Sequence, residues 1–468
     1  SFIFEIDAVG RNRCHYVFSV VTLLCRERRD LDSLQTEFVG GNMELPVNMN
    51  SLWEATAQDW IHEKLDGPAE AAIVVIGAGI TGLSAALKAA EADHKVIVLD
   101  AHHPGWGASG RNGGQVIPGL KELPDEIVRR FGADRGEQIV DFAGRTAETV
   151  FETISHHHID CDAHRGGWVE PAYHARALRG LVAKSEQWQA RNADVELLDK
   201  NAIAEATGSD VFLGGFHDRR AGSVHPLKYS LGLGVAARKA GALIYSHVTV
   251  KSVDQQTDGF IVETNKGQIR ADRVLMCTNG YTDPSFGPVG RSVAPVASIQ
   301  IATDPLPDIL RQKIMPKGIS GSDTNRLLVY FRLDAEGRFL IGGRGATFAS
   351  GLERLFPKLQ RHATRMFPDL ADVTWPYRWG GLLALTSDHY PKIHEPVPGF
   401  VMAMGYNGRG VALATQWGAA ISDYALSGNK KLLPIPITPI KQFPFHRLRT
   451  VGIEVAAFWY GFLDRMGV

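Results

Sequence analysis

The sequence predicts an α/β fold in which a nucleotide-binding domain is interrupted by a second domain with a mixed sheet. At 468 residues the chain is too long for one ordinary core. A pattern of strand, glycine turn, helix and strand occupies residues 73–100, and a similar unit occupies 400–426. Between them, residues 296–303, 326–333 and 338–342 have the alternating or β-branched character of strands.

The first unit begins with Ile73–Ile76, a β-branched run typical of a buried parallel strand. A helical pattern and a second strand, Val96–Leu99, follow the glycine turn, and Asp100 and Ala101 end the unit. The predicted phosphate-binding turn consists of Gly77, Ala78, Gly79, Ile80, Thr81 and Gly82. This complete context makes a dinucleotide site a stronger prediction than a structural glycine turn.

Each part of this turn has an expected task. Gly77 makes the tight turn, Gly79 lets the backbone approach a pyrophosphate, and Gly82 lets the helix pack closely on the strand. The helix N-terminus offers free N–H groups and partial positive charge to the phosphates. We expect Asp100 to accept hydrogen bonds from the adenosine ribose.

A second glycine-rich segment distinguishes FAD from NAD. It contains Gly107, Ala108, Ser109, Gly110, Arg111, Asn112, Gly113, Gly114 and Gln115. Its backbone can lie flat against a planar ring, and Ser109 and Arg111 can reach phosphate oxygens. Because an NAD dehydrogenase has no need of such a loop, we expect FAD; a flexible surface loop is the alternative.

The C-terminal unit consists of an apolar strand, 400–404, a glycine turn and a helix, 411–426, that stops at Gly428. The turn supplies Gly405, Gly408, Arg409, Gly410 and Val411 as expected cofactor contacts. A helix N-terminus and Arg409 at the pyrimidine edge of a flavin would stabilise the negative charge that reduction leaves near N1. A packing turn is the alternative interpretation.

A third glycine-rich stretch, residues 232–237, does not predict a nucleotide site. No apolar strand precedes it, and His225-Pro226 opens the segment, so we expect a helix with packing glycines. With one convincing dinucleotide motif, the chain is expected to take its electrons from the substrate and not from NADPH.

Together these motifs resemble the D-amino acid oxidase/sarcosine oxidase superfamily of flavoproteins, and within it the γ-glutamylputrescine oxidase branch. The resemblance covers residues 51–468. Its motifs are Gly77 to Ser84, Gly107 to Gln115, Ile159-Asp160-Cys161-Asp162, His225-Pro226-Leu227, Tyr377-Arg378-Trp379 and Gly405 to Val411. The resemblance implies a Rossmann-like FAD-binding domain, a mixed-sheet substrate domain and amine oxidation.

The resemblance also assigns the domains. The FAD-binding domain is expected at 49–165, 216–290 and 385–445, and the substrate domain at 166–215 and 291–384. Residues 1–48 are expected to be a dispensable extension, and 446–468 a C-terminal tail. Val248, Asn279 and Gly280 are further expected cofactor contacts.

Departures from relatives refine this expectation. Leu383 and Gly107 stand where some relatives attach flavin through a cysteine or a histidine, which implies noncovalent FAD. Ala412 stands where sarcosine oxidases use a lysine to hold the substrate carboxylate, so an amine is favoured over an α-amino acid. A histidine is common at the position of Arg409, and the substrate could differ with it.

The implied reaction transfers a hydride from the carbon beside the amine nitrogen to the flavin. Neutralising a free amine of pKa about 10.4 near pH 7.4 costs roughly 4 kcal/mol, and a dry pocket offsets part of this cost. No dedicated base is required. His225, Tyr330 and Trp379 are weak catalytic candidates, because a helix-opening histidine and core aromatics are equally common alternatives.

A γ-glutamyl tail would place the charges of the substrate far from the reacting amine. Arg332 or Arg378, each beside a predicted pocket aromatic, could meet that carboxylate at the mouth of the pocket. An ordinary surface ion pair is the alternative for either arginine. The expected small molecules are therefore an amine substrate and molecular oxygen as the electron acceptor.

Composition excludes several other classes of partner. The formal net charge of -1 does not favour nucleic acid or an anionic membrane. The apolar run 16–25 is too short for a stable membrane span. Four scattered cysteines fit a reducing cytoplasm. We expect no metal, because His156-His157-His158 close a helix without carboxylate or cysteine partners at ligand spacing in the sequence.

Three alternatives to an FAD-dependent amine oxidase remain open from the sequence. One is a flavin-dependent amine or amino-acid dehydrogenase that passes electrons to an acceptor other than oxygen. Another is the flavoprotein domain of a tRNA-modifying system, which the net charge and the lack of a second catalytic domain disfavour. The third is a nonenzymatic flavin-binding scaffold.

Overall fold

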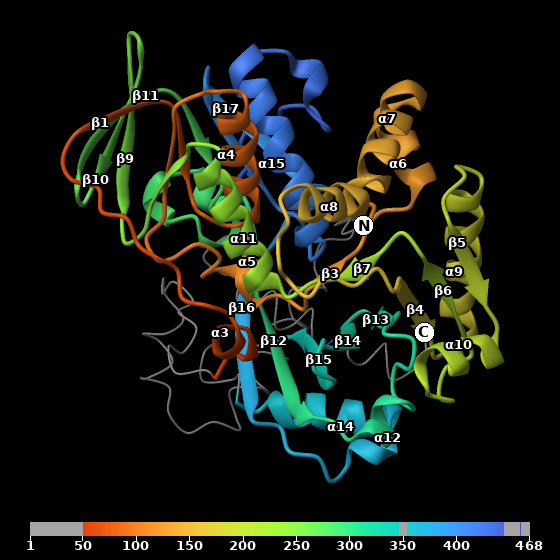
Figure 1. Ribbon diagram of the computed structural model, residues 1–468. Coiled ribbons are helices and arrows are strands. Elements are labelled where there is room, and N and C mark those ends of the chain that lie inside the picture. The colour runs from red at the N-terminus through yellow and green to blue at the C-terminus, as the bar shows by residue number, and fades with distance from the viewer. Residues whose placement is uncertain (1–49, 346–352, 444–458, 460–468) are drawn as a thin grey trace, which may run out of the picture.

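The computed structural model describes residues 50–345, 353–443 and 459 (Figure 1). The extension expected at 1–48 lies outside the described residues, and so does the tail at 446–468 apart from Trp459. Two large sheets dominate the described chain, one in the upper part of the view and one in the lower part. No helix in the described ranges is both long enough and apolar enough to cross a bilayer.

The first sheet belongs to the nucleotide-binding region. Its strands are β1 (Ala69–Ile76), β2 (Val96–Leu99), β8 (Leu243–Tyr245), β9 (Val250–Gln256), β10 (Gly259–Thr264), β11 (Gly267–Met276), β17 (Lys392–Val397) and β18 (Phe400–Met404). The order is β17-β18-β11-β1-β2-β8, and β10 and β9 extend antiparallel from β11. β1 has parallel neighbours on both sides, which explains why Ile73–Ile76 is apolar at every position.

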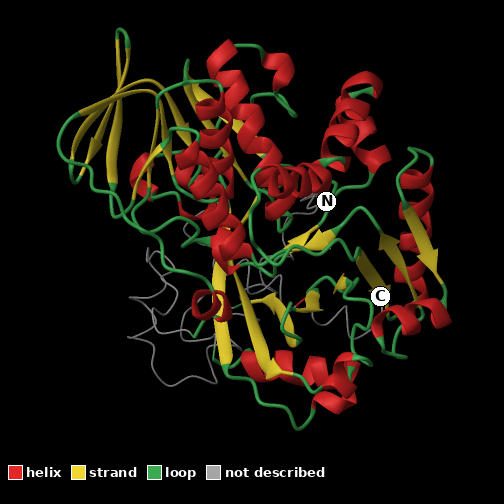
Figure 2. Ribbon diagram, in the orientation of Figure 1, coloured by secondary structure: helices red, strands yellow, loops and turns green. Residues whose placement is uncertain are grey.

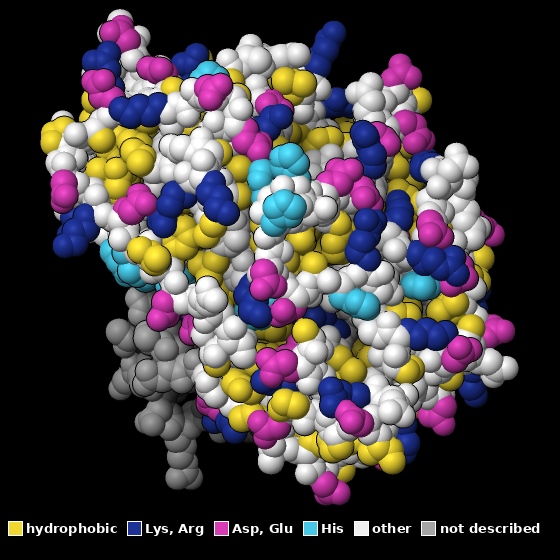
Figure 3. Space-filling model, in the orientation of Figure 1, with side chains coloured by type: hydrophobic (Ala, Val, Ile, Leu, Met, Phe, Trp, Pro, Cys, Tyr) yellow, Lys and Arg dark blue, Asp and Glu magenta, His cyan; other side chains and the backbone are white. Residues whose placement is uncertain are grey.

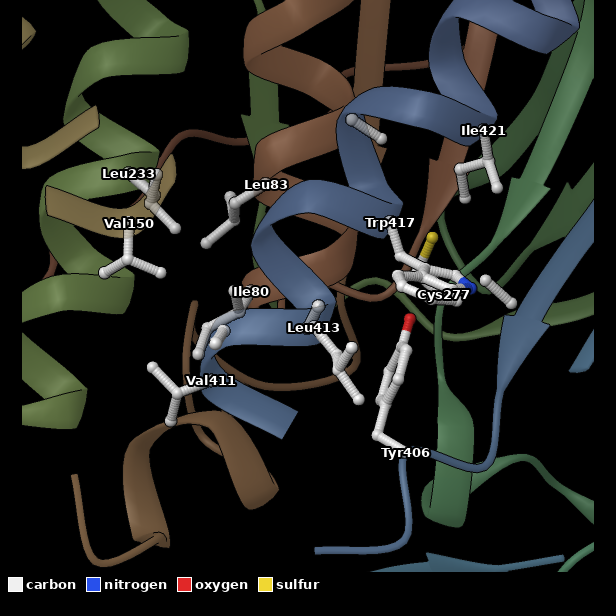
Figure 4. Close-up of a cluster of buried hydrophobic side chains, with 14 of the residues drawn as sticks. Ile80, Leu83, Val150, Leu233, Cys277, Tyr406, Val411, Leu413, Trp417 and Ile421 are labelled. Atoms are coloured by element: carbon white, nitrogen blue, oxygen red, sulfur yellow. The ribbon is translucent and has the colours of Figure 1, made fainter. Parts of the chain in front are cut away.

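Three helices pack beside this sheet and on each other: α4 (Ile80–Glu91), α11 (Pro226–Lys239) and α15 (Gly410–Ser427). Figure 4 shows Ile80 and Leu83 of α4 directed towards the space between α11 and α15. At Gly418 of α15 an added methyl group would lie 2.3 Å from the Thr81 carbonyl oxygen. The glycine therefore lets the backbones of α15 and α4 approach closely. As the sequence predicts, Gly428 ends α15 in the left-handed conformation.

The second sheet is mixed, as the sequence predicts. Its strands are β4 (Trp168–Ala172), β5 (Val195–Leu198), β6 (Gly214–Asp218), β12 (Ala294–Pro305), β13 (Ser320–Ser322), β14 (Val329–Leu333), β15 (Arg338–Arg344) and β16 (Tyr377–Leu385). The order is β16-β12-β15-β14-β13-β4-β6-β5, and the β13–β4 pair is parallel while the other pairs are antiparallel. The strands expected at 326–333 and 338–342 pair as the antiparallel hairpin β14–β15. In its turn the Asp334 carboxylate accepts the backbone N–H groups of Glu336 and Arg338.

Shorter elements complete the described fold (Figure 2). The remaining helices are α3 (Leu52–Thr56), α5 (Ala108–Arg111), α6 (Pro124–Phe131), α7 (Ala133–Gly144), α8 (Thr146–His156), α9 (Ala175–Gln189), α10 (Lys200–Thr207), α12 (Asp308–Arg311) and α14 (Phe356–Met366). A two-stranded ribbon joins β3 (Gln115–Val116) to β7 (Gly222–Ser223), and five 3-10 turns lie at 279–281, 284–286, 289–291, 368–370 and 430–432.

The boundaries proposed for the two domains stay a prediction, and two of them fall within strands of the second sheet. The boundary at 215/216 divides β6, and the boundary at 384/385 divides the last residues of β16. We propose moving both to the ends of these strands. Limited proteolysis that released fragments cut inside β6 or β16 would contradict this revision.

Two helical glycines provide a matched test of the α4–α15 packing. Gly418→Ala should lower stability by about 1–3 kcal/mol, since the methyl group meets the Thr81 carbonyl. Gly180→Ala at an exposed position of α9, where an added methyl group would meet no atom within 4 Å, should raise stability by roughly 0.5–1 kcal/mol. Urea unfolding measures both changes, and an equal gain in both variants would contradict the close packing.

Candidate functional site

The glycine turn between β1 and α4 has no room for side chains. Gly77 has φ +102°, and a methyl group there would lie 3.2 Å from the carbonyl carbon of Cys277. At Gly82 a methyl group would lie 1.9 Å from the Gly77 carbonyl oxygen. The tight turn and the close approach of helix to strand are thus present, and they fix the direction of the α4 N-terminus.

Ser109 lies directly over that N-terminus. Its hydroxyl accepts the Ile80 N–H at 2.9 Å, and a methyl group on Gly79 would come within 2.7 Å of the same oxygen. The first-turn N–H groups of Thr81 and Gly82 have no acceptor available inside α4. Free donors, a hydroxyl and a glycine cradle therefore converge where a phosphate would bind.

Asp100 lies at the carboxyl end of β2, beside the turn. Its two oxygens accept the backbone N–H groups of Ala78 at 2.7 Å and His102 at 2.8 Å, and burial raises its pKa. Each oxygen keeps a lone pair for a ribose hydroxyl. The Val248 N–H bonds to the Asp100 carbonyl at 2.8 Å, which places Val248 at the same sheet edge, while the neighbouring Ala101 is exposed.

The segment 107–115, called the 107–115 loop below, contains the one-turn helix α5 and enters β3 at Gln115, and its own side chains hold it. The Asn112 amide donates to the carbonyls of Ala108 and Ser109, and its oxygen accepts the Gly114 N–H at 2.7 Å. The Gln115 amide donates to the Gly321 carbonyl of β13 at 2.7 Å, so the loop bridges the two sheets.

Two glycines of this loop face aromatic rings from other elements. A methyl group on Gly107 would lie 3.2 Å from the Tyr281 ring, and one on Gly113 would lie 2.8 Å from the Tyr330 ring. Glycine at these positions lets the loop backbone lie directly on the rings.

Arg111 has structural contacts that the sequence did not predict, and its cofactor contact stays a prediction. Its guanidinium donates to the Trp106 carbonyl at 2.7 Å and to the Glu54 carboxylate at 3.1 Å, and it lies 5.0 Å from the Trp106 ring centroid. The side chain therefore fastens the loop to α3, and no described contact directs it to the phosphate end of α4.

The C-terminal turn meets the first turn at a buried hydrogen bond. The hydroxyls of Tyr406 and Thr81 lie 2.9 Å apart, and the Asn279 side chain accepts the Gly405 N–H at 2.8 Å. Figure 4 shows Tyr406 beneath Trp417 and Val411 near Ile80, so the N-termini of α15 and α4 lie together. Gly405 and Gly408 have φ of +78° and +91°, conformations that favour glycine.

The other predicted residues of this region are near the same turns. Gly280 lies in the 3-10 turn 279–281, where an added methyl group would be 3.5 Å from the β16 backbone. Gly410 and Val411 are the first two residues of α15. Arg409, immediately before them, donates to the Pro118 carbonyl at 2.8 Å, and its guanidinium lies 5.7 Å from the Trp168 ring centroid.

One face of the second sheet is turned towards the 107–115 loop. Gln300 of β12 and Trp379 of β16 both donate to the Arg111 carbonyl, the latter at 3.1 Å. The other amide atom of Gln300, Oε1, is buried without a partner among the described residues. An orphaned acceptor beside the Gly113 backbone is consistent with a missing hydrogen-bond donor of the cofactor or substrate.

The three weak catalytic candidates each have a structural partner. The His225 ring accepts the Lys228 N–H at 3.2 Å as the cap of α11, and its other nitrogen lies 3.0 Å from the Thr56 hydroxyl. The Tyr330 hydroxyl bonds to Ser298 at 2.8 Å, and burial raises its pKa. Trp379 is wholly buried. These contacts favour the structural interpretation that the sequence left open.

The two arginines predicted at the pocket mouth have different surroundings. Arg332 is buried, and it donates to the carbonyls of Gly113 at 2.8 Å and Val224 at 2.8 Å. Arg378 is exposed and forms a 3.5 Å ion pair with Glu353. Because β-strand side chains alternate, Arg378 points away from the face that carries Trp379. Arg332 supports the loop through these bonds and also lines a small pocket beside Trp53 and His225, so its place at the mouth of a substrate pocket stays a prediction.

The histidine run has a carboxylate neighbour that sequence spacing could not reveal. Glu91, the last residue of α4, lies 3.3 Å from His157, and ligand atoms of Glu91, His156 and His157 all lie within 4.8 Å of one another. The expected lack of a carboxylate partner is therefore wrong. The cluster is largely exposed at the end of α8, and the absence of a metal stays a prediction.

Several residues that shape the site were not predicted from the sequence. Tyr406, Tyr281 and Gln300 contact Thr81, Gly107 and Arg111 respectively, and each pair is more than 100 positions apart in sequence. One feature of the sequence could have indicated Gln300, since it is a lone amide within an apolar strand. Taken together, the glycine cradle, the free N–H groups, the Asp100 carboxylate and the orphaned Gln300 oxygen fit a bound FAD.

The phosphate end of α4 generates a direct test. Gly79→Val should abolish flavin binding, because the side chain fills the space beside the Ser109 hydroxyl. Asp100→Ala should weaken binding by only about 1.5–3 kcal/mol, the contribution of a charge-assisted hydrogen bond. The 450 nm absorbance of purified protein measures both effects. Parental flavin content in both variants would show that the site is wrongly placed.

The burial of His225 predicts how the free energy of unfolding changes at acid pH. Burial lowers the pKa of this histidine to about 3, from 6.5, so folding holds the ring neutral. The unfolded chain gains a proton as the pH falls below 6.5, and stability present above that pH is lost progressively towards pH 3.

His225→Asn keeps a capping side chain and removes the titrating ring. Between pH 8 and pH 5 it should lose less stability than the parent, by about 2 kcal/mol. Urea unfolding at the two pH values measures this difference. Identical pH dependence in both proteins would contradict a buried neutral histidine.

Comparison with known proteins agrees with this geometry. The model of the FAD dependent oxidoreductase family, DAO, matches residues 72–424. The chain is 34% identical over 403 residues to the gamma-glutamylputrescine oxidoreductase of Escherichia coli strain K12, covering 85% of this chain and 93% of that protein. It is 30% identical over 425 residues to the probable oxidoreductase OrdL of Haemophilus influenzae, covering 88% and 96%.

Solved structures share the fold at lower identity. Glycine oxidase from Geobacillus kaustophilus superposes with a TM-score of 0.66 at 19% identity, over 76% of this chain and 95% of that one. L-proline dehydrogenase from P. horikoshii gives 0.65 at 19% identity, over 79% and 96%. The matched family spans both glycine turns and both sheets, and the chain belongs to the DAO family of FAD-dependent oxidoreductases that act on CH–NH groups.

Proposed function

We propose that this enzyme oxidises the terminal amine of γ-glutamylputrescine, or of a similar γ-glutamylated amine, in polyamine breakdown. The observation that carries the proposal is the 34% identity to the Escherichia coli gamma-glutamylputrescine oxidoreductase across most of both chains. Ala412 supports it, because this small residue of α15 is 1% exposed and cannot hold a carboxylate beside the reacting carbon.

The reaction consumes amine, oxygen and water and yields aldehyde, ammonia and hydrogen peroxide. Bound FAD supplies a two-electron acceptor for the hydride of the carbon next to nitrogen. The protein contributes position and exclusion of water. Ser298, Tyr330 and Trp379 are buried or nearly buried on the face that meets the 107–115 loop.

These surroundings favour a neutral amine over an ammonium ion, which offsets part of the roughly 4 kcal/mol that deprotonation near neutral pH requires. His225 is committed to capping α11. We therefore assign no general base to the described residues.

We propose that FAD is held without a covalent bond. Leu383 on β16 and Gly107 in the loop, the positions of attachment in some relatives, offer no nucleophile. Thr81, Ser109 and Asp100 provide noncovalent contacts in their place. Acid precipitation should leave the flavin in solution, and flavin in the protein pellet would refute this point.

The substrate assignment is tested by comparing specificity. γ-Glutamylputrescine should have a much higher kcat/KM than free putrescine, because binding energy from the tail can hold the amine in place. Sarcosine, glycine and D-alanine should be poor substrates. Amine consumption, measured separately from peroxide release, distinguishes an oxidase from a dehydrogenase with another acceptor. Faster turnover of sarcosine or a D-amino acid than of every γ-glutamylated amine would overturn the assignment and leave the family unchanged.

A further inference from the structure

A cluster of charged and aromatic side chains lies where the second sheet meets the C-terminal glycine turn. Its members are Trp168 and Glu170 of β4, Lys184 of α9, Asp218 of β6, Arg220 after β6, and Arg409. Lys184 forms an ion pair with Glu170, and its ammonium lies 4.8 Å from the Trp168 ring centroid. Arg409 contacts the same ring at 5.7 Å. The Trp168 ring therefore lies between two cations, Lys184 from the region of the second sheet and Arg409 from the C-terminal glycine turn.

The charges of this cluster do not balance. Glu170 neutralises Lys184, and Asp218 binds Arg220 through a 2.6 Å contact between Oδ2 and Nη2. Arg409 is the remaining cation. It is partly buried, and among the described residues its guanidinium has one hydrogen bond, to the Pro118 carbonyl, and no ion pair. A guanidinium has five N–H donors, so most of its binding capacity is unused.

The cluster lies close to the expected cofactor site, so the free N–H donors of Arg409 are near that site. Arg409 directly precedes α15, whose first turn meets the N-terminus of α4 through Tyr406 and Thr81. On the other side, the Trp168 indole donates to the Ser322 hydroxyl at 3.2 Å, and that hydroxyl donates to Gln115 of the 107–115 loop at 2.9 Å. Arg409 therefore lies at the inner junction of the two sheets, where a long substrate could reach it.

We propose that Arg409, stacked on Trp168, binds the carboxylate at the far end of the substrate and thereby selects γ-glutamylated amines. This inference rests on the proposed function. A guanidinium pairs with a carboxylate through two parallel N–H···O bonds, and the partly buried setting strengthens that contact. The Lys184–Glu170 pair holds Trp168 in place beside the guanidinium.

The test compares two substrates in the flavin-loaded enzyme: γ-glutamylputrescine and its analogue with the carboxylate replaced by a carboxamide. Arg409→Met should lower kcat/KM for γ-glutamylputrescine by roughly 10- to 150-fold, the factor for a hydrogen bond between charged groups. For the carboxamide it should change kcat/KM less than about 3-fold. Arg409→Lys should fall between parent and Arg409→Met. The exposed Arg378→Met, which removes an arginine outside the site, should leave both values unchanged.

A binding measurement removes the chemical step from the comparison. γ-Glutamylbutylamide has the same head and lacks the reacting amine, so its Kd can be read from perturbation of the flavin spectrum. Arg409→Met should raise this Kd by the same factor as it lowers kcat/KM, with flavin content and Tm reported for each variant.

The possible failures are distinguishable. Equal loss on both substrates with an unchanged Kd would show that Arg409 acts on the flavin, and would overturn this inference alone. Parental specificity in Arg409→Met would also overturn it. If the parent oxidised neither γ-glutamylputrescine nor any γ-glutamylated amine, the proposed function and this inference would fall together.

Discussion

The close approach of three backbones at Gly77, Gly82 and Gly418 is the constraint on which the rest of the structure depends. A methyl group at Gly82 would lie 1.9 Å from the Gly77 carbonyl oxygen, and one at Gly418 would lie 2.3 Å from the Thr81 carbonyl oxygen. No side chain separates β1, α4 and α15 at these points. The N-termini of α4 and α15 are therefore brought together, and a ligand with both a pyrophosphate and an anionic ring edge can interact with both.

The second sheet depends on this arrangement through the 107–115 loop. The loop begins beside the α4 N-terminus, where Ser109 binds the Ile80 N–H, and it ends at Gln115, whose amide donates to the Gly321 carbonyl of β13. Arg332 supports the loop from below through the Gly113 carbonyl, and burial lowers the pKa of its guanidinium to about 10. A buried cation solvated by backbone carbonyls holds the loop in place.

The elements that the sequence predicts well are those whose signals are local. β1, β2, β18 and α15 follow from short apolar runs and glycines within one stretch of chain. The observed bounds of β2, β18 and α15 agree with the expected ones to within one residue, whereas β1 begins at Ala69, four residues before the apolar run. The capping role of His225 follows equally from the His-Pro pair that opens α11. In each case the residues that determine the conformation are neighbours in sequence.

The site residues were predicted less completely because their partners are distant in sequence. Arg111 has a guanidinium suited to phosphate, but the decisive partner, Glu54, comes from a helix 57 positions earlier. Arg332 stands beside an aromatic residue in sequence, and strand pairing buries it against the loop. Glu91 approaches His157 only because α4 and α8 end at the same surface; Figure 3 shows histidine side chains gathered on this face. The type of each residue indicates which interactions its side chain can form, but tertiary packing determines which partner it meets.

The two ends of the proposed substrate need different surroundings: the amine needs neutral groups and the carboxylate needs a cation. The described side chains provide these at opposite ends of the proposed site. Deprotonating the amine is easier where no fixed charge and little water surround it. The face near the 107–115 loop meets this demand with neutral groups, Ser298, Gln300 and Tyr330. A carboxylate needs a cation that the protein has not already neutralised, and Arg409 at the β4 end provides one. The same exclusion of water that disfavours the ammonium strengthens the guanidinium–carboxylate contact, so a single dry site can activate one end of the molecule and hold the other.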